Sequence, residues 1–241
     1  IQQALEFASG STLDVSSTTL GGIFTRTDID TADGSIDISA SGLLTATDVQ
    51  SGNNNPINLS GNGIAAGIIN AGTGSVSLNG LGGAIVDNGS ILIADQLILT
   101  NASSIGDSTN TLNSAVSSIN FENGNTGAVY LSNSSGSGVT VSGTTTGIIQ
   151  ISETSGNNLT LSASSALISG NNDISLITDG LILNTGSSID AGTGTLLIRP
   201  NNVAQLINLG SVATSSLSIT QDMLNQMTAT TLTIGGAAQT A

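Results

Sequence analysis

The sequence predicts an all-β solenoid, in which short strands wind into stacked coils. Three observations support this: an apolar-x-apolar strand returns about every twenty residues, Gly, Asn and Ser separate the strands, and the pattern continues along all 241 residues. A strand-rich recurrence of this length is typical of a solenoid, because each coil buries its apolar side chains against its neighbours. We therefore expect about twelve coils of about twenty residues, forming one continuous solenoid segment over residues 1–241.

The strands can be followed by the first apolar residue of each one. Alternation along each strand places the apolar side chains inside and the intervening Ser, Thr, Asn and Asp outside. The Gly and Asn residues between strands suit turns that need positive φ. The steps are 19 to 22 residues, apart from two steps of 15, and the recurring positions are Ile36, Ile57, Val76, Leu97, Ile119, Val139, Leu159, Leu181, Leu196, Leu217 and Leu232.

Two local features interrupt the uniform pattern. Residues 70–80 and 190–200 share an AGTG turn followed by a strand, which indicates that one corner design is used twice. Residues 221–227, QDMLNQM, carry the one helical signal, and either a single helical turn or a bulging loop fits it.

The composition favours a folded repeat protein over a disordered chain. Apolar residues make up 38% of the chain and aromatic residues 2%, while charged residues make up 7%, against roughly 25% in an ordinary globular domain. The 31 glycines alone would suit a linker. The positive mean hydropathy argues against that interpretation, since disorder accompanies low hydrophobicity.

The charge balance excludes two classes of partner. Sixteen Asp and Glu face two cations, Arg26 and Arg199, giving a formal net charge of −14. Two arginines far apart in the sequence cannot neutralise a row of phosphates, so we expect no nucleic-acid binding and no attraction to anionic membrane surfaces. The carboxylates occur singly along the chain, a pattern that favours solubility.

The sequence contains no cysteine and no apolar run of eighteen residues. Stability must therefore come from stacked coils rather than disulfides, and we expect no segment that inserts into a membrane. The chain begins at Ile1 and shows no signal peptide. We interpret it as a segment of a longer secreted protein.

Several segments resemble the passenger repeats of filamentous haemagglutinin-type exoproteins, which are exported by two-partner secretion. They are GSIDIS at 34–39, GSVSLNG at 74–80, NLTLSAS at 158–164 and LSITQDMLNQMTATTLTIG at 217–235. The passengers of autotransporters are similar. The resemblance implies a right-handed parallel β-helix, export through an outer-membrane pore, and a role in adhesion or as a rigid stalk. NNNPIN at 53–58 lacks the Asn that follows Pro in the export motif of the family, so the chain is interpreted as part of the shaft.

These observations predict a non-catalytic, extracellular shaft of a bacterial cell-surface adhesin. The expected partners are receptors or glycans of a host or neighbouring cell, or further copies of the chain, and the secretion pore during export. Two alternatives stay open: a subunit of an extracellular filament or surface layer, and a β-helix that binds or cleaves carbohydrate.

The chain contains few of the residue types that enzymes use for catalysis. Without His or Cys, nucleophilic triads and imidazole acid–base chemistry are excluded. Glycoside cleavage needs two carboxylates in a cleft, and the densest acidic stretch is Asp28 to Asp37, with Asp48 beyond it. Sugar clefts also favour aromatic platforms, which this chain almost lacks. We expect no catalytic residue and no cofactor.

The same stretch supplies the weak candidates for a metal site: Asp28, Asp30 and Asp33. Alternating oxygen ligands around a Gly turn are the raw material of a calcium loop. The spacing fails for an EF-hand, because the third Asp comes one position late and no Glu closes the loop. We therefore expect a solvated corner rather than a metal site.

Overall fold

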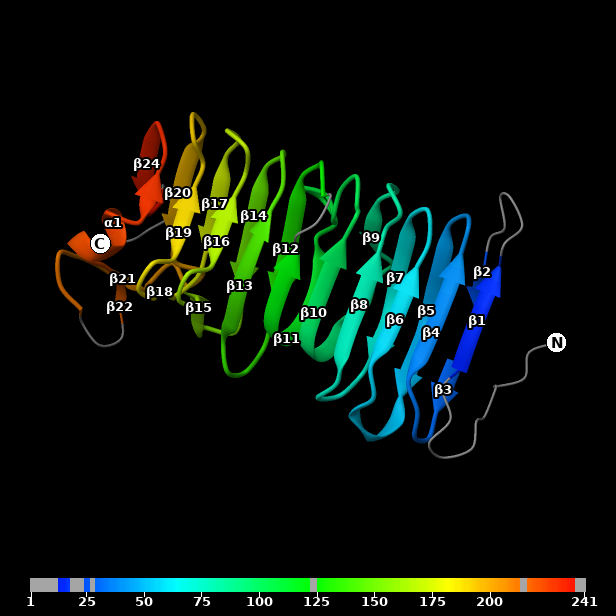
Figure 1. Cartoon of the computed structure of the whole chain (residues 1–241). Coiled ribbons are helices and arrows are strands. Elements are labelled where there is room, and N and C mark those ends of the chain that lie inside the picture. Colours follow the sequence, from blue (N-terminus) through cyan, green and yellow to red (C-terminus); the bar gives the residue numbers. More distant parts are fainter. Residues whose placement is uncertain (1–12, 18–23, 27–28, 122–124, 213–215, 237–241) are drawn as a thin grey trace.

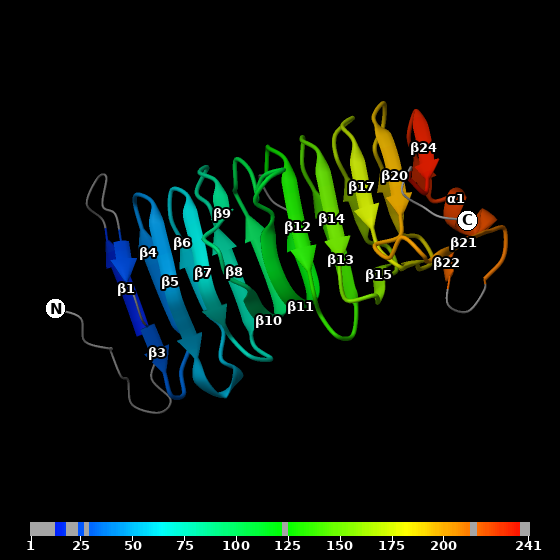
Figure 2. The same ribbon diagram turned by 180° about the vertical axis from the view of Figure 1, so that it is seen from behind.

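The protein is an elongated parallel β-solenoid in a computed structural model, which describes residues 13–17, 24–26, 29–121, 125–212 and 216–236 (Figure 1). Twenty-two of its strands belong to one hydrogen-bonded sheet that winds around the core. About eight turns of about 21 residues stack side by side. The view from behind shows the same regular stack on the other side (Figure 2). We call a row of strands that pair from turn to turn a ladder.

Ladder A forms one face of the rod. Its partners lie in register, so that Ile36, Ile57 and Val76 stack directly above one another. Ladder A comprises β1 (Leu13–Ser17), β4 (Ile36–Ala40), β6 (Ile57–Ser60), β8 (Ser75–Asn79), the ends of β10 (Leu92–Thr100) and β11 (Leu112–Phe121), β13 (Val139–Thr144), β15 (Asn158–Leu161) and β18 (Gly180–Leu183).

Ladder B forms a second face and continues to the last strand. A single bridging residue, Ile105, carries it between β9 and β12. Ladder B comprises β2 (Phe24–Arg26), the starts of β5 (Leu44–Ser51) and β7 (Ile64–Asn70), β9 (Ile85–Asp87), β12 (Val129–Asn133), β14 (Ile149–Glu153), β17 (Ile174–Ile177), β20 (Thr195–Arg199) and β24 (Thr231–Ile234).

A third face differs between the two halves of the rod. In the N-terminal half, ladder C follows ladder B within each turn and comprises β3 (Ile29–Thr31), the ends of β5 and β7 and the starts of β10 and β11. In the C-terminal half, ladder D precedes ladder B and comprises β16 (Ala166–Ile168), β19 (Ser188–Asp190) and β23 (Met227–Thr228), continuing from the end of β13. The cross-section of the rod therefore changes along its length.

An insertion separates β20 from β24, so that Leu196 pairs with Leu232, 36 residues later. It contains β21 (Leu206–Leu209) and β22 (Ser216–Ile219), which form a separate parallel pair, and the single helical turn α1 (Gln221–Leu224). The Thr220 hydroxyl caps α1 by accepting a hydrogen bond from Met223 N. This confirms a helical turn at the position where the sequence carried its helical signal.

The core is a continuous aliphatic column along the axis of the rod. The predicted alternation is confirmed: on β13, Val139 and Val141 are buried, while Thr140 between them is half-buried on the outer wall. Each buried side chain contacts its own turn and the two neighbouring turns, so stability is spread along the rod rather than concentrated in one place.

The predicted count of twelve coils was wrong, and the registers explain why. Leu181 lies on ladder A, but Leu196 lies on ladder B and pairs with Ile174. The two 15-residue steps in the sequence are thus steps between faces and not between turns. Strands on all faces carry the same apolar-x-apolar pattern, so the sequence does not show which face a strand joins. Leu217 is buried on β22, outside the main sheet.

The predicted reuse of one corner is confirmed in detail. Asn70 and Asp190 each accept a hydrogen bond from the backbone N–H two residues later, at 2.9 and 2.8 Å. Gly72 and Gly192 adopt φ of 58° and 55°. The burial patterns of residues 71–80 and 191–200 are identical. The first corner joins ladder C to ladder A and the second joins ladder D to ladder B, so the same design serves two different edges of the rod.

A seam of buried polar side chains replaces aliphatic packing at one corner of the middle turns. The Ser114 hydroxyl donates to Asn133 Oδ1 (3.0 Å), and Asn133 Nδ2 donates to Glu153 Oε2 (2.9 Å). Glu153 Oε1 accepts from Ser155 N (2.9 Å) and from the Ser155 hydroxyl. Glu153 and Asn133 have no exposed surface. Buried polar groups are tolerated when hydrogen-bonded, and here each turn supplies partners to the next.

Candidate functional site: a polar hollow on the wall of ladder A

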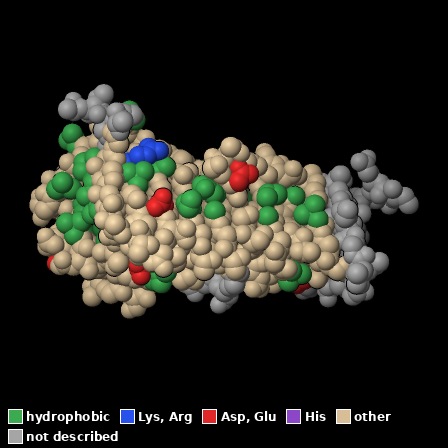
Figure 3. Space-filling model, turned by 90° about the horizontal axis from the view of Figure 1, so that it is seen from above, with side chains coloured by type: hydrophobic (Ala, Val, Ile, Leu, Met, Phe, Trp, Pro, Cys, Tyr) green, Lys and Arg blue, Asp and Glu red, His purple; other side chains and the backbone are tan. Residues whose placement is uncertain are grey.

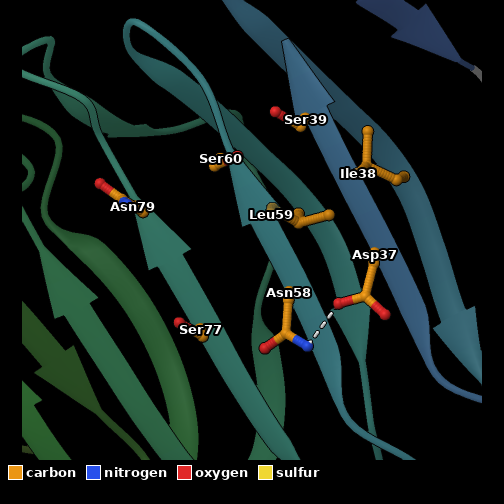
Figure 4. Close-up of a pocket in the computed structure, with 8 residues that line it drawn as sticks. All are labelled: Asp37, Ile38, Ser39, Asn58, Leu59, Ser60, Ser77 and Asn79. Carbon is orange, nitrogen blue, oxygen red and sulfur yellow. Dashed lines mark hydrogen bonds between the residues drawn. The ribbon is translucent and has the colours of Figure 1, made fainter. Parts of the chain in front are cut away.

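A shallow hollow of about 320 Å³ lies on the outer wall of ladder A, across β4, β6 and β8. Figure 4 shows its lining, in which successive strands contribute side chains at matching positions. We call it the polar hollow, and it is lined by Asp37, Ile38, Ser39, Asn58, Leu59, Ser60, Ser77 and Asn79.

Strand alternation determines which of these side chains reach the surface. On β6, Ile57 and Leu59 are buried in the core, so the side chain of Asn58 between them stands on the outer wall. The parallel register then aligns the outward residues of three turns in two rows. One row is Asp37, Asn58 and Ser77, and the other is Ser39, Ser60 and Asn79.

One hydrogen bond orders the first row. Asn58 Nδ2 donates to Asp37 Oδ1 across the two turns at 2.7 Å (Figure 4). In the second row, Asn79 Oδ1 accepts from Leu81 N and from Asn101 Nδ2, both at 3.2 Å. The two amides are therefore oriented, while the polar atoms on their other sides face solvent.

Three further hollows lie on or beside the same ladder. One of about 180 Å³ includes Thr140 and Thr160, and one of about 320 Å³ includes Asn158 and Ile182. A groove of about 620 Å³ lies between β18 and the insertion and includes Ile182, Val212 and Met223. Hydrophobic side chains gather over this C-terminal end of the rod (Figure 3). The exposed apolar residues there are Ile182, Val203, Leu206, Leu209 and Val212.

The acidic stretch predicted from sequence is dispersed over the surface. Asp28 lies outside the described residues, and Asp30 is exposed on β3. Asp33 accepts a hydrogen bond from Asn55 Nδ2 (3.1 Å) in the next turn. Within the described part of the chain, no three acidic side chains come close enough to hold a metal ion. Asp30 and Asp33 therefore form no three-carboxylate metal site in the described part of the chain.

The other two carboxylates of that stretch lie on different walls. Asp37 belongs to the polar hollow, whereas Asp48 on β5 accepts from Gln50 Nε2 (2.9 Å). Asp37 is the one ionisable side chain among the residues that line the hollow, so the hollow does not contain the acid pair that glycoside cleavage requires. What the hollow offers is hydrogen bonding from amides, hydroxyls and one carboxylate.

A perturbed carboxyl occurs away from the hollow, in the turn after Ile105. The hydroxyl of Thr109 lowers the pKa of Asp107 by donating to its carboxylate (2.6 Å), and the backbone N–H groups of Thr109 and Asn110 act in the same direction. This is the hydrogen bonding of an Asx turn, so the lowered pKa accompanies a local structural role.

The sequence could have located the outward rows but not the hollow. Asp37, Asn58 and Ser77 occupy equivalent places in successive repeats, which the periodicity shows. The two rows lie two residues apart on the same strands, so alternation places them side by side, but no motif in the chain shows that their side chains leave a hollow.

The helices of the described residues are all too short to cross a membrane. Comparison of the chain with protein-family models, with curated proteins and with solved structures finds no match.

Proposed function

We propose that this chain is a structural and adhesive shaft segment of a large secreted bacterial surface protein, of the filamentous haemagglutinin type. The observation that carries the proposal is the unbroken stack of turns, with ladder B continuing from β2 to β24. A stack of this kind extends along one axis and holds whatever it carries at a fixed distance from its base. The repeat segments that resemble those adhesins support the same proposal.

In this role the chain is not an enzyme and works outside the cell. It would pass through an outer-membrane pore during export and then present its walls to receptors or glycans of other cells. Net charge of −14 keeps neighbouring shafts apart and in solution. The turns need no cysteine, because each turn is stabilised by its neighbours.

Surface labelling of the source cells tests the proposal. Antibodies raised against the purified chain should label intact cells, and protease added outside the cells should remove the label. Labelling that appears after lysis alone would contradict an extracellular shaft.

Electron microscopy of the labelled surface separates the shaft from its alternative. Isolated rods standing off the cell are expected for a shaft. A regular lattice or end-to-end polymers would instead identify the chain as a subunit of a surface layer or filament. That alternative has one observation in its favour: among the described strands β24 pairs with β20 alone, and a strand at the end of a stack can pair with a strand of another copy.

A further inference from the structure

We propose that the polar hollow on β4, β6 and β8 binds a linear, uncharged polysaccharide that lies along the axis of the rod. The inference rests on the proposed adhesive function and deepens it, since it names the site and the class of ligand.

The first observation is the set of polar atoms left available in the hollow. In the described part of the chain they make no hydrogen bond to protein, although the Asn58–Asp37 and Asn79–Asn101 contacts fix the orientation of their side chains. These atoms are Asp37 Oδ2, Asn58 Oδ1, Asn79 Nδ2 and the hydroxyl oxygens of Ser39, Ser60 and Ser77. They form a set of donors and acceptors on three consecutive turns.

The second observation is the spacing of these atoms. Parallel strands repeat at about 4.8 Å, so each row offers one polar side chain per turn in the direction of the axis. A polymer of sugar rings presents hydroxyl groups at regular intervals. An extended polymer that lies across the strands therefore meets polar side chains of a new turn at each interval. A ligand laid along one strand would meet only two outward side chains of that strand.

The third observation concerns the chemistry of the lining. Amides and hydroxyls both donate and accept, as sugar hydroxyls do. The one charged group is Asp37, and the chain carries a net charge of −14, so an anionic polysaccharide is disfavoured. The lining contains no aromatic side chain, so flat aromatic ligands have nothing to stack on.

The row of Asp37, Asn58 and Ser77 is interrupted in the turn after β8. At the positions that follow Ser77 in its row stand Ile98, Asn120 and Ser142. Ile98 interrupts the polar row, and in the turns beyond it Asn120 Nδ2 donates to the Ser142 hydroxyl (3.0 Å). The uninterrupted polar row that the hollow uses therefore ends at β8.

Binding is tested by NMR titration of the isotopically labelled full chain with four soluble hexasaccharides. Three are neutral and β-1,4-linked, made of glucose, mannose or N-acetylglucosamine, and the fourth is α-1,4-linked galacturonate. We expect at least one neutral hexasaccharide to bind, with a dissociation constant on the order of 1 mM because the contacts are few and exposed. The shifted amide signals should map to β4, β6 and β8. No binding by any neutral sugar, or tighter binding of galacturonate, would overturn the inference.

Two variants and a matched control locate the site. Asn58→Ala removes an oriented amide, and we expect affinity to fall about tenfold, the effect of losing about one hydrogen bond together with the ordering of Asp37. Ser60→Gln fills the hollow without adding charge and should weaken binding at least as much. Asn120→Ala removes a similar amide from the same wall and should leave binding unchanged. Thermal unfolding of each variant checks the fold.

An equal loss of affinity in Asn58→Ala and Asn120→Ala would overturn the location of the site. The result is independent of the cell-labelling experiment. If antibodies label the chain on the cell surface but the chain binds no neutral sugar, the sugar-binding inference is wrong and the proposed shaft function still stands. A chain that binds the sugar but lies inside the cell removes the proposed function.

Discussion

The turns from β4 to β8 and the C-terminal end of the rod both bury aliphatic side chains in the core, but they differ in the number of residues between paired strands. Between Ile36, Ile57 and Val76 the registers advance by 21 and 19 residues. Between Leu196 and Leu232 they advance by 36, and the additional residues form β21, β22 and α1 beside the stack. Both regions still bury the same type of aliphatic side chain in the column.

The difference teaches that a solenoid constrains the residues on its ladders far more than those between them. A ladder residue must fit the turns before and after it, whereas an inserted segment needs only to leave and rejoin the stack. The insertion accordingly exposes Leu206, Leu209 and Val212, at 70%, 63% and 82% of their surface, while ladder residues such as Val76 and Leu78 are fully buried. The following predictions test that contrast.

The largest effect is expected from a substitution on a ladder, compared with one in the insertion. Val139→Asp places an unpaired carboxylate in the column, where the native side chain is 2% exposed, and should lower the free energy of unfolding by at least about 4 kcal/mol. Val212→Asp, in the insertion, should change it by less than about 0.5 kcal/mol. Chemical denaturation followed by circular dichroism measures both. Thr140→Asp, on the outer wall, should also be nearly silent, and equal damage from all three would contradict the assignment of inner and outer positions.

The second largest effect is expected at the buried polar seam around Glu153. Glu153→Ala leaves Asn133 Nδ2 and Ser155 N without their acceptor in a buried site and should destabilise the protein by about 3 kcal/mol. Glu153→Gln keeps the size of the side chain but turns one acceptor into a donor that faces other donors, so about 2 kcal/mol is expected. Equilibrium unfolding compares the two variants. A stabilised alanine variant would mean that the seam tolerates a cavity better than a buried carboxylate.

The duplicated corner predicts a matched pair of moderate effects. Gly72→Ala and Gly192→Ala each place a Cβ on a residue with φ near 55–58°, against the Asn54 and Asn171 side chains respectively. Each should cost roughly 1–2 kcal/mol. Gly136→Ala, where an added Cβ meets nothing within 4 Å, should cost less than about 0.5 kcal/mol. The melting temperatures of the three variants measure these effects. Unequal losses of stability at Gly72 and Gly192 would show that the two corners are not equivalent.

The smallest effect concerns Asp107, an exposed residue between ladders. Its pKa is lower in the folded protein than the ordinary value of 3.8, so the stability that its ionised form contributes is present above that value and is lost as pH falls through the lowered pKa. Asp107→Asn removes the titration. The gap in melting temperature between the native protein and the variant should therefore be constant near pH 6 and shrink below about pH 3.8. A gap that widens with acid would contradict the sign of the shift.

Much of the fold could be predicted from the sequence, because burial imposes a period. The alternation on β6 and β13, the near-twenty-residue repeat and the AGTG corner all follow from residue types. The assignment of strands to ladders could not be predicted, since Leu181 and Leu196 occupy the same motif on different faces. The polar hollow could not be predicted either: the repeat aligns Asp37 with Asn58, but a hollow depends on how the outward side chains pack. The sequence offered Asp28, Asp30 and Asp33 only as weak metal candidates, in a stretch expected to be a solvated corner.

The reused corner has a consequence for how such a protein changes over evolutionary time. The same turn works at two edges of the rod, 120 residues apart between Gly72 and Gly192, so this corner can connect two different pairs of ladders. We therefore expect a chain that has gained or lost one coil of about 21 residues to fold, with the flanking coils joined through the same kind of backbone hydrogen bonds. Each such event alters the reach of the rod by one strand spacing, about 4.8 Å. The length of the rod can thus change by whole coils, without the repacking that a compact globular core would need.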